Sequence, residues 1–287
     1  MLGRLRMSTL DALKAYDQFA GRIFSEKNRK KNPGQRWTQM YKATELRNTI
    51  QQLVAEQIDE ELMRDSRKLE ERGRSFVCSK PVGEHRRTVR FRSYDIDNDL
   101  YKHLKIWEAA RATTAAPMYF KPMTITNDVA ETEDFVDGAI GCNNPTEILL
   151  EEADLLYGKQ RKLGCVVSLG TGTKVQELAG TSNGIHAKAS WIKSLGMVMK
   201  EITVDCEETH DRAKKKFESF SGAYFRFNVA GGAQGIKLED WGMMEELKQK
   251  TRNYLLEDEA KAMVDDLANV LLQKGPNHGL TIGHIGK

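Results

Sequence analysis

The stretch Phe135-Val136-Asp137-Gly138-Ala139 decides how the chain is interpreted, because apolar residues lead there into an acid followed by glycine. The apolar residues predict the end of a buried strand. Gly138 permits a sharp turn where that strand breaks. A bare Asp-Gly is often no more than a turn. In an open α/β sheet, however, an acid between the carboxyl end of a strand and a helix lies where ligands bind. Asp137 is therefore our candidate catalytic residue.

The composition is that of a globular protein. Lysine and arginine number 44 against 41 acids, and the formal net charge of +3 gives no sign of a nucleic-acid partner. The four cysteines form no CxxC pair and indicate reduced thiols in a cytoplasmic protein. The six histidines are scattered without metal-ligand spacing, so we expect no metal and no cofactor. The basic loop at residues 26–36 is interpreted as solvated, with peripheral contact to anionic lipid headgroups left open.

Hydrophobic periodicity predicts strands that alternate with helices, and therefore an α/β fold. The strands are expected at residues 75–82, 88–94, 118–126, 134–137, 165–169 and 223–229. The helices are expected at residues 8–24, 46–58, 100–116, 144–158, 187–218, 243–256 and 257–274. The order strand, helix, strand between residues 134 and 169 predicts a parallel βαβ unit. The continuous apolar run at 165–169 predicts a strand covered on both faces.

Two other patterns compete with Asp137 as the centre of a site. Gly170-Thr171-Gly172-Thr173 follows a strand, as phosphate-binding loops do, but the lysine and the spacing of a P-loop are absent. Residues 180–184 match G-x-S-x-G, which offers Ser182 as a nucleophile. The polar residues before them make a poor core strand, so we interpret Ser182 as part of a surface loop.

Four stretches, in this order and spacing, together resemble the patatin-like phospholipase family. They are WEAARATTAAP at residues 107–117, Asp137-Gly138-Ala139, residues 143–145 and residues 168–172. Residues 226–229 and 238–241 are similar to a later part of the fungal members. The resemblance implies hydrolysis of lipid acyl esters by a Ser–Asp dyad, with Asp137 as the general base inside the D-G-A motif. Without a histidine between them, the carboxylate must meet the serine hydroxyl directly, at about 2.6–3.2 Å.

The family's glycine-rich loop and its G-x-S-x-G elbow are both missing, and residues 1–8 resemble the segment just after the elbow. We therefore expect residues 1–274 to be the C-terminal portion of a patatin-like domain, cut just after its nucleophile, and residues 275–287 to be a flexible tail. The expected fold is a three-layer α/β/α arrangement with a mainly parallel sheet whose N-terminal strands are missing. The apolar face of the helix at 10–24 is then expected to be exposed.

Two functions follow from this interpretation. In the first, the chain belongs to a lipid acyl hydrolase that acts on lipid or phospholipid esters, and it carries Asp137 but not the nucleophile. In the second, it is a non-catalytic module that keeps the fold for binding. A G-x-S-x-G run in frame upstream of Met1 would favour the first. Either protein is expected in the cytoplasm, with peripheral contact to membranes open and no nucleic-acid partner.

Overall fold

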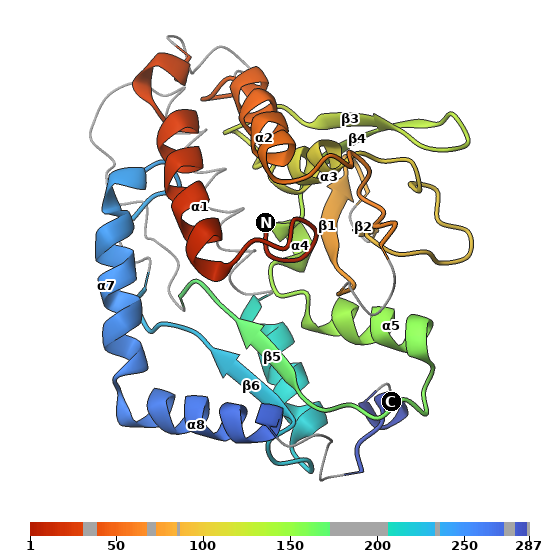
Figure 1. Ribbon diagram of the computed structural model, residues 1–287, viewed down its shortest axis with the longest axis vertical. Coiled ribbons are helices and arrows are strands. Elements are labelled where there is room, and N and C mark those ends of the chain that lie inside the picture. Colours follow the sequence, from red (N-terminus) through yellow and green to blue (C-terminus); the bar gives the residue numbers. More distant parts are fainter. Residues whose placement is uncertain are drawn as a thin grey trace. The chain divides into compact units, whose positions relative to one another are not determined.

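The computed structural model describes residues 1–30, 39–67, 73–84, 87–172, 206–232, 236–272 and 279–285 (Figure 1). These residues form two compact units. The first consists of Met1–Cys142 together with Leu238–Gly242, and the second holds the remaining described residues. Asp137 lies in the first unit, so the architecture of that unit positions the candidate site.

The sheet of the first unit has four strands in the order β2-β1-β4-β3, and every neighbouring pair is antiparallel. Its strands are β1 (Phe76–Pro81), β2 (Val89–Arg92), β3 (Met123–Thr126) and β4 (Thr132–Asp137). The prediction of a mainly parallel sheet is therefore wrong for these strands. The physical reason is visible in the connection between β3 and β4, which is far too short for a parallel crossover and permits only a hairpin. Asn127 closes that hairpin, because its side-chain oxygen accepts the amides of Val129 and Glu131.

One face of this sheet is covered by α3 (Ile106–Thr113), which contacts β1, β3 and β4 (Figure 1). The alternation predicted for β2 is confirmed, since Val89 and Phe91 are buried while Arg90 and Arg92, which alternate with them, are only partly buried. Phe91 packs edge-on against Phe135 of β4, with ring centroids 5.3 Å apart. Burial of each ring stabilises the fold by roughly 2–3 kcal/mol. The buried alanines of α3 complete this core and let the helix approach the sheet closely.

The start predicted for this helix is wrong, because α3 begins at Ile106 rather than near residue 100. Glu108 provides the cap, since its carboxylate accepts the Lys105 amide at 2.9 Å. The expected capping acids serve the preceding turn instead. Asp99, for example, accepts the amide of Tyr101 at 3.0 Å.

A second core in this unit lies between α1 (Thr9–Ile23), α2 (Ala43–Gln57) and the segment after α3. Ser8 caps α1 as predicted, because its hydroxyl oxygen accepts the Asp11 amide at 3.1 Å. The expected exposure of the apolar face of α1 is confirmed only in part. Leu10, Leu13 and Tyr16 are exposed, whereas Ala20 and Ile23 are buried. The short helix η1 (Glu26–Asn28) follows.

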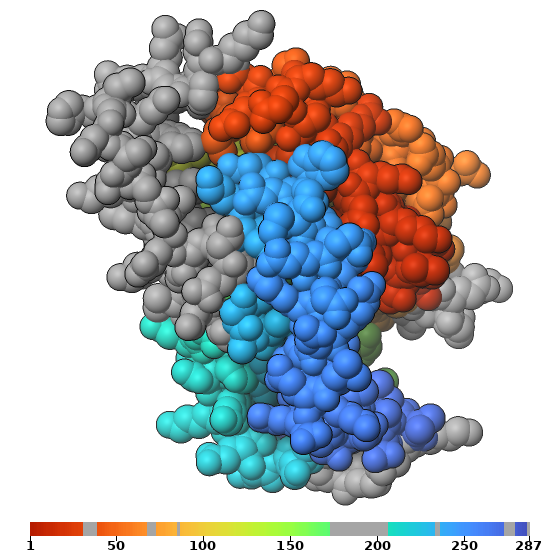
Figure 2. All heavy atoms as spheres, turned by 90° about the vertical axis from the view of Figure 1, so that its left-hand side faces the viewer, coloured from red at the N-terminus to blue at the C-terminus, as the bar shows by residue number. Residues whose placement is uncertain are grey.

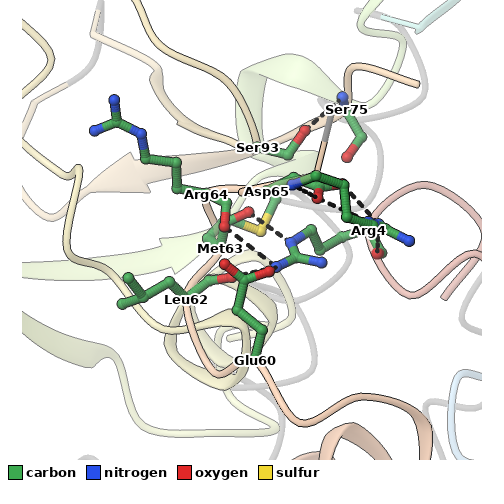
Figure 3. A network of polar contacts seen from close by, with 9 residues as sticks. Arg4, Glu60, Leu62, Met63, Arg64, Asp65, Ser75 and Ser93 are labelled. Carbon is green, nitrogen blue, oxygen red and sulfur yellow. Dashed lines mark hydrogen bonds and ion pairs between the residues drawn. The ribbon is translucent and has the colours of Figure 1, made fainter. Parts of the chain in front are cut away.

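Arg4 fastens the N-terminal segment to the chain before β1 (Figure 3). Its guanidinium donates to the carbonyl oxygens of Met63 and Leu62, both at 2.9 Å, and pairs with Glu60 at 2.6 Å. The neighbouring Asp65 is also buried, and its amide donates to the Ser93 carbonyl at 2.9 Å. The N-terminal residues are thus tied to the segment that leads into the sheet.

The second unit holds a separate parallel pair, β5 (Val166–Leu169) and β6 (Tyr224–Phe227). Its helices are α5 (Thr146–Tyr157), residues 206–217, α7 (Met244–Leu255), α8 (Asp258–Leu272) and α9 (Ile282–Ile285), and η3 (Trp241–Met243) precedes α7. The predicted βαβ unit is wrong in its pairing, because β4 and β5 belong to different sheets among the described strands. The prediction that β5 is covered on both faces is also wrong, since Leu169 is 74% exposed.

The two long helices α7 and α8 confirm the prediction for residues 243–274, and both lie at the surface in Figure 2. Of the residues 275–287 expected to form a flexible tail, Leu280 and Ile285 are buried against α5 and β5, so residues 279–285 are packed. Within the described part of the chain, no helix combines the length and the apolar character needed to cross a membrane.

Candidate active site

Asp137 is the last residue of β4, and the chain turns at Gly138 into the short helix α4 (Ala139–Cys142). The prediction that this acid ends a strand is therefore confirmed. The helix that we predict after it, with its start at Asn144, is not α4 but α5, which begins at Thr146 in the second unit. Gly138 is required here, because a Cβ at this position would collide with the carbonyl oxygen of Cys78 on β1. The D-G-A stretch thus forms a tight turn at the end of β4.

The carboxyl group of Asp137 is partly buried and, counting the described residues alone, has one hydrogen bond, from the Ala139 amide to Oδ1 at 2.8 Å. Burial raises the pKa of this carboxyl from 3.8 to about 6, although the Ala139 amide acts in the opposite direction. The Ala139 amide favours the ionised form, as we expect of backbone amides at the start of a helix, but burial has the larger effect on the Asp137 pKa. Among the described residues, no arginine or lysine pairs with Asp137.

The backbone at Asp137 is held from the side of α3. The Asp137 amide donates to the Ala115 carbonyl at 3.1 Å, and the Gly138 amide donates to the Thr113 carbonyl at 3.3 Å. Residues 113–115 belong to the small-residue run at positions 109–116, where alanines and threonines predominate within the WEAARATTAAP stretch. Two carbonyls at the end of α3 therefore accept the last amide of β4 and the first amide after it.

The nearest serine in the sheet is Ser79, which lies directly opposite Asp137 in the register of β1 and β4. Its side chain is fully buried, and its hydroxyl donates to the Val136 carbonyl at 2.7 Å. Ser79 therefore supports the strand and does not face a substrate. Ser182 and the G-x-S-x-G match at 180–184 lie outside the described residues.

The motif residues Asn144 and Ser168 lie in the second unit and take part in one buried polar cluster. Asn144 Oδ1 accepts the hydroxyl of Thr146 at 2.7 Å and its amide at 3.3 Å. Asn144 thus supports the start of α5, although Pro145, and not the predicted Asn144, is the N-cap residue. Arg226 of β6 donates to the Ser168 hydroxyl at 2.8 Å. These contacts tie α5 to the parallel pair, which is a structural task.

The loop after β5 is likewise occupied by protein groups. The Gly172 amide donates to Asn228 Oδ1 at 2.8 Å, and the Gly170 amide donates to the Phe227 carbonyl at 2.8 Å. A Cβ at Gly170 would collide with the side chain of Asn228. Two amides that a phosphate would need are therefore already paired, which agrees with the rejection of a P-loop.

A shallow hollow of about 270 Å³ lies elsewhere in the first unit, between β2 and residues 96–101. Asp137 does not line it, so the cleft expected at Asp137 stays a prediction. Among the described residues, no cluster of three or more acidic, histidine or cysteine side chains is placed to hold a metal ion. None of the four cysteines, all of which are described, forms a disulfide bond.

Two residues of the small-residue run have roles that the sequence analysis did not foresee. Thr113 bonds to both strands at the turn, through its hydroxyl to the Cys78 carbonyl at 2.6 Å and through its own carbonyl. Arg111 is buried, donates to the Lys121 carbonyl at 2.6 Å and lies over the Phe120 ring. Burial lowers the pKa of Arg111 to about 10. The sequence offered one signal for these roles, because one arginine and two threonines interrupt a run that is otherwise alanine.

Comparison with known proteins places the D-G-A motif within a matched region. The family described as patatin-like phospholipase matches residues 7–150, about half of the chain. Patatin-like phospholipase 1 of Plasmodium falciparum (isolate NF54) is 27% identical over 198 residues, which cover 63% of this chain and 28% of that protein.

Two further relatives cover shorter stretches. Calcium-independent phospholipase A2-gamma of Mus musculus is 34% identical over 124 residues, or 43% of this chain and 14% of that protein. Phospholipase A I of Arabidopsis thaliana is 29% identical over 141 residues, or 48% of this chain and 10% of that protein. The chain thus spans less than a third of the length of each of these relatives.

Proposed function

The chain belongs to the patatin-like phospholipase family, and we propose that it supplies the general base, Asp137, to a Ser–Asp dyad that hydrolyses acyl esters of lipids. The names of its relatives support a lipid substrate. The observation that best supports this proposal is the environment of Asp137. Its carboxyl group is partly buried at the end of a strand, and burial raises the pKa of this group to about 6. That value is close to the ordinary pKa of histidine, about 6.5. A base with this pKa accepts a proton near neutral pH without help from an imidazole.

The geometry assigns different tasks to the two carboxylate oxygens. Oδ1 is held by the Ala139 amide, which fixes the orientation of the group. Oδ2 has no hydrogen bond among the described residues and is left to accept the serine proton. As the serine oxygen bonds to the ester carbonyl carbon, Asp137 takes that proton and then returns it to the leaving alcohol. Water then releases the acyl group from the serine.

We propose further that the serine nucleophile and the oxyanion donors come from residues outside these 287. No described serine bonds to Asp137, and Ser79 is committed to Val136. The finer features inferred from the sequence, namely a fungal-type member, a three-layer domain and a cytoplasmic protein with peripheral membrane contact, remain part of this proposal. The four cysteines, none of which forms a disulfide bond, are consistent with a reducing compartment.

The test compares the 287-residue chain with a protein extended upstream in its own reading frame through the glycine-rich loop and the elbow. We expect the extended protein to hydrolyse p-nitrophenyl esters and phospholipid vesicles, and the 287-residue chain to stay at background. Asp137→Asn in the extended protein should lower kcat by about 10²- to 10⁴-fold, the usual contribution of a general base. The matched control is Asp134→Asn, an exposed acid on the same strand, which should keep full activity.

Three results would contradict this assignment. Turnover by the 287-residue chain alone that is lost on Ser182→Ala would identify Ser182 as the nucleophile. Full activity of the extended Asp137→Asn protein would remove Asp137 from catalysis. Absence of turnover in every form, together with retained binding to phospholipid vesicles, would favour the non-catalytic binding module.

A further inference from the structure

The hydrogen-bond ladder between β1 and β4 has a regular order that ends at the candidate base. The Val82 amide donates to the Asp134 carbonyl at 2.8 Å, and the register pairs Lys80 with Val136 and Ser79 with Asp137. In antiparallel strands, hydrogen-bonded pairs alternate with pairs that are not bonded. Asp137 therefore falls in a non-bonded pair, and the next bonded pair of a continued ladder would join Cys78 to Gly138.

Thr113 occupies the place of that bonded pair. Its hydroxyl donates to the Cys78 carbonyl at 2.6 Å, and its carbonyl accepts the Gly138 amide at 3.3 Å. One residue at the end of α3 thus satisfies both groups that would otherwise bond to each other. The ladder ends at Asp137, and the chain is free to turn at Gly138 into α4.

We propose that Thr113 is a positioning residue that ends the β1–β4 ladder at Asp137 and so sets the turn in which the Ala139 amide holds the carboxylate. The proposal deepens the assignment of Asp137 as the general base, and its test needs no turnover. Without the Thr113 hydroxyl, the Cys78 carbonyl loses its partner and attracts the Gly138 amide. The turn then shifts, and the bond from Ala139 to Asp137 Oδ1 is lost.

Burial has the largest effect on the Asp137 pKa, and the Ala139 amide is the hydrogen bond that acts on it among the described residues. Lys80 and Cys78 flank Ser79 on β1 and leave the sheet on the face opposite to Asp137, where the Lys80 ammonium lies beside Gly141 of α4. Arg111 of α3 donates to the Lys121 carbonyl, and Glu133 of β4 is paired with Arg87. Cys142 of α4 is a buried thiol. Burial and the Ala139 amide are accordingly the causes that shift the Asp137 pKa.

The test is an NMR titration of the Asp137 carboxyl carbon in the 287-residue chain, with the signal assigned by its loss in Asp137→Asn. Thr113→Val removes the hydroxyl and keeps the shape. Because a hydrogen bond to a charged group is lost, we expect it to raise the Asp137 pKa by about one unit. Thr113→Ser keeps the donor and should restore the original value.

The matched control is Thr114→Val at the adjacent residue, whose hydroxyl donates only to the Ala110 carbonyl within the same helix turn. This variant should leave the Asp137 titration unchanged. A Thr113→Val protein that is less stable but titrates at the original pKa would show that Thr113 is merely structural, and would overturn the proposal without touching the role of Asp137. Loss of activity in Asp137→Asn alone tests the proposed function separately.

A measurement on the unmodified chain decides the matter if Thr113→Val does not fold. The Ala139 amide should shift with the same midpoint as the Asp137 carboxyl, because the two are hydrogen-bonded. The Gly138 amide should be protected from hydrogen exchange by the Thr113 carbonyl. A Gly138 amide that exchanges as fast as an open loop would contradict the proposed contact.

Discussion

Two aspartates of the first unit, the buried Asp65 and the partly buried Asp137, have opposite environments. Asp65 is only 2% exposed and receives three hydrogen bonds from Arg67, among them side-chain bonds at 2.8 and 2.6 Å (its neighbours are drawn in Figure 3). Arg67 holds the pKa of Asp65 below its ordinary value, against a smaller opposing effect of burial. Asp137 has one amide and no cation among the described residues, and burial raises its pKa to about 6.

This difference shows that the role of an acid depends on whether a cation pairs with its carboxylate. When an arginine pairs with an acid, it stabilises the charged carboxylate and fixes its orientation. The pKa of such an acid is therefore low. An acid that is desolvated without a counter-ion binds a proton readily, which suits a general base and disfavours stability at neutral pH. Substitution of each acid by asparagine should therefore change stability in opposite directions.

The larger effect is expected at Asp65. Asp65→Asn leaves the Arg67 guanidinium without its carboxylate, next to the buried Arg4. Removal of one partner from a buried ion pair costs about 3–5 kcal/mol, and we expect about 3 kcal/mol because Arg67 is partly exposed. Urea denaturation at pH 7.5 measures this loss. An unchanged free energy of unfolding would mean that the pair is solvated and that the contrast with Asp137 is false.

A smaller effect of opposite sign is expected at Asp137. Between pH 4 and pH 6 the folded chain binds a proton at Asp137 that the unfolded chain has released, so stability falls as the pH rises through this window. The shift of about two units corresponds to at most about 3 kcal/mol. Asp137→Asn should therefore be more stable than the unmodified chain by about 2 kcal/mol at pH 7.5 and equal to it at pH 4.

Paired denaturation curves at the two pH values test this prediction, since every other titrating group is shared by the two proteins. A constant difference between the proteins at both pH values would show that Asp137 has an ordinary pKa. A less stable Asp137→Asn protein at pH 7.5 would show that the carboxylate is a structural acid like Asp65.

Local patterns in the sequence predicted several elements correctly, because their causes are local. Ser8 and Asp11 correctly predicted the start of α1. The alternation of Val89 and Phe91 with arginines correctly predicted β2. The position of Asp137 at the end of a strand also followed from its neighbours. These features depend on caps and on periodicity over a few residues.

Strand pairing was missed because it depends on residues far apart in the chain. The residues near Asp137 do not indicate that β4 pairs with β1, which lies some sixty residues earlier, and not with β5. The raised pKa of Asp137 was missed for the same reason, since its burial depends on how distant segments pack and not on its neighbours in the sequence. Thr113 was visible only as one member of a small-residue run until the strands it joins were known.

The most direct test of the account is the carboxyl titration of Asp137 and Asp65 measured together by NMR in the 287-residue chain. The account predicts a midpoint near pH 6 for Asp137 and one below the ordinary aspartate value of 3.8 for Asp65. A midpoint at or below 3.8 for Asp137 would contradict it, because such a carboxylate is too weak a base to act on a serine without a histidine.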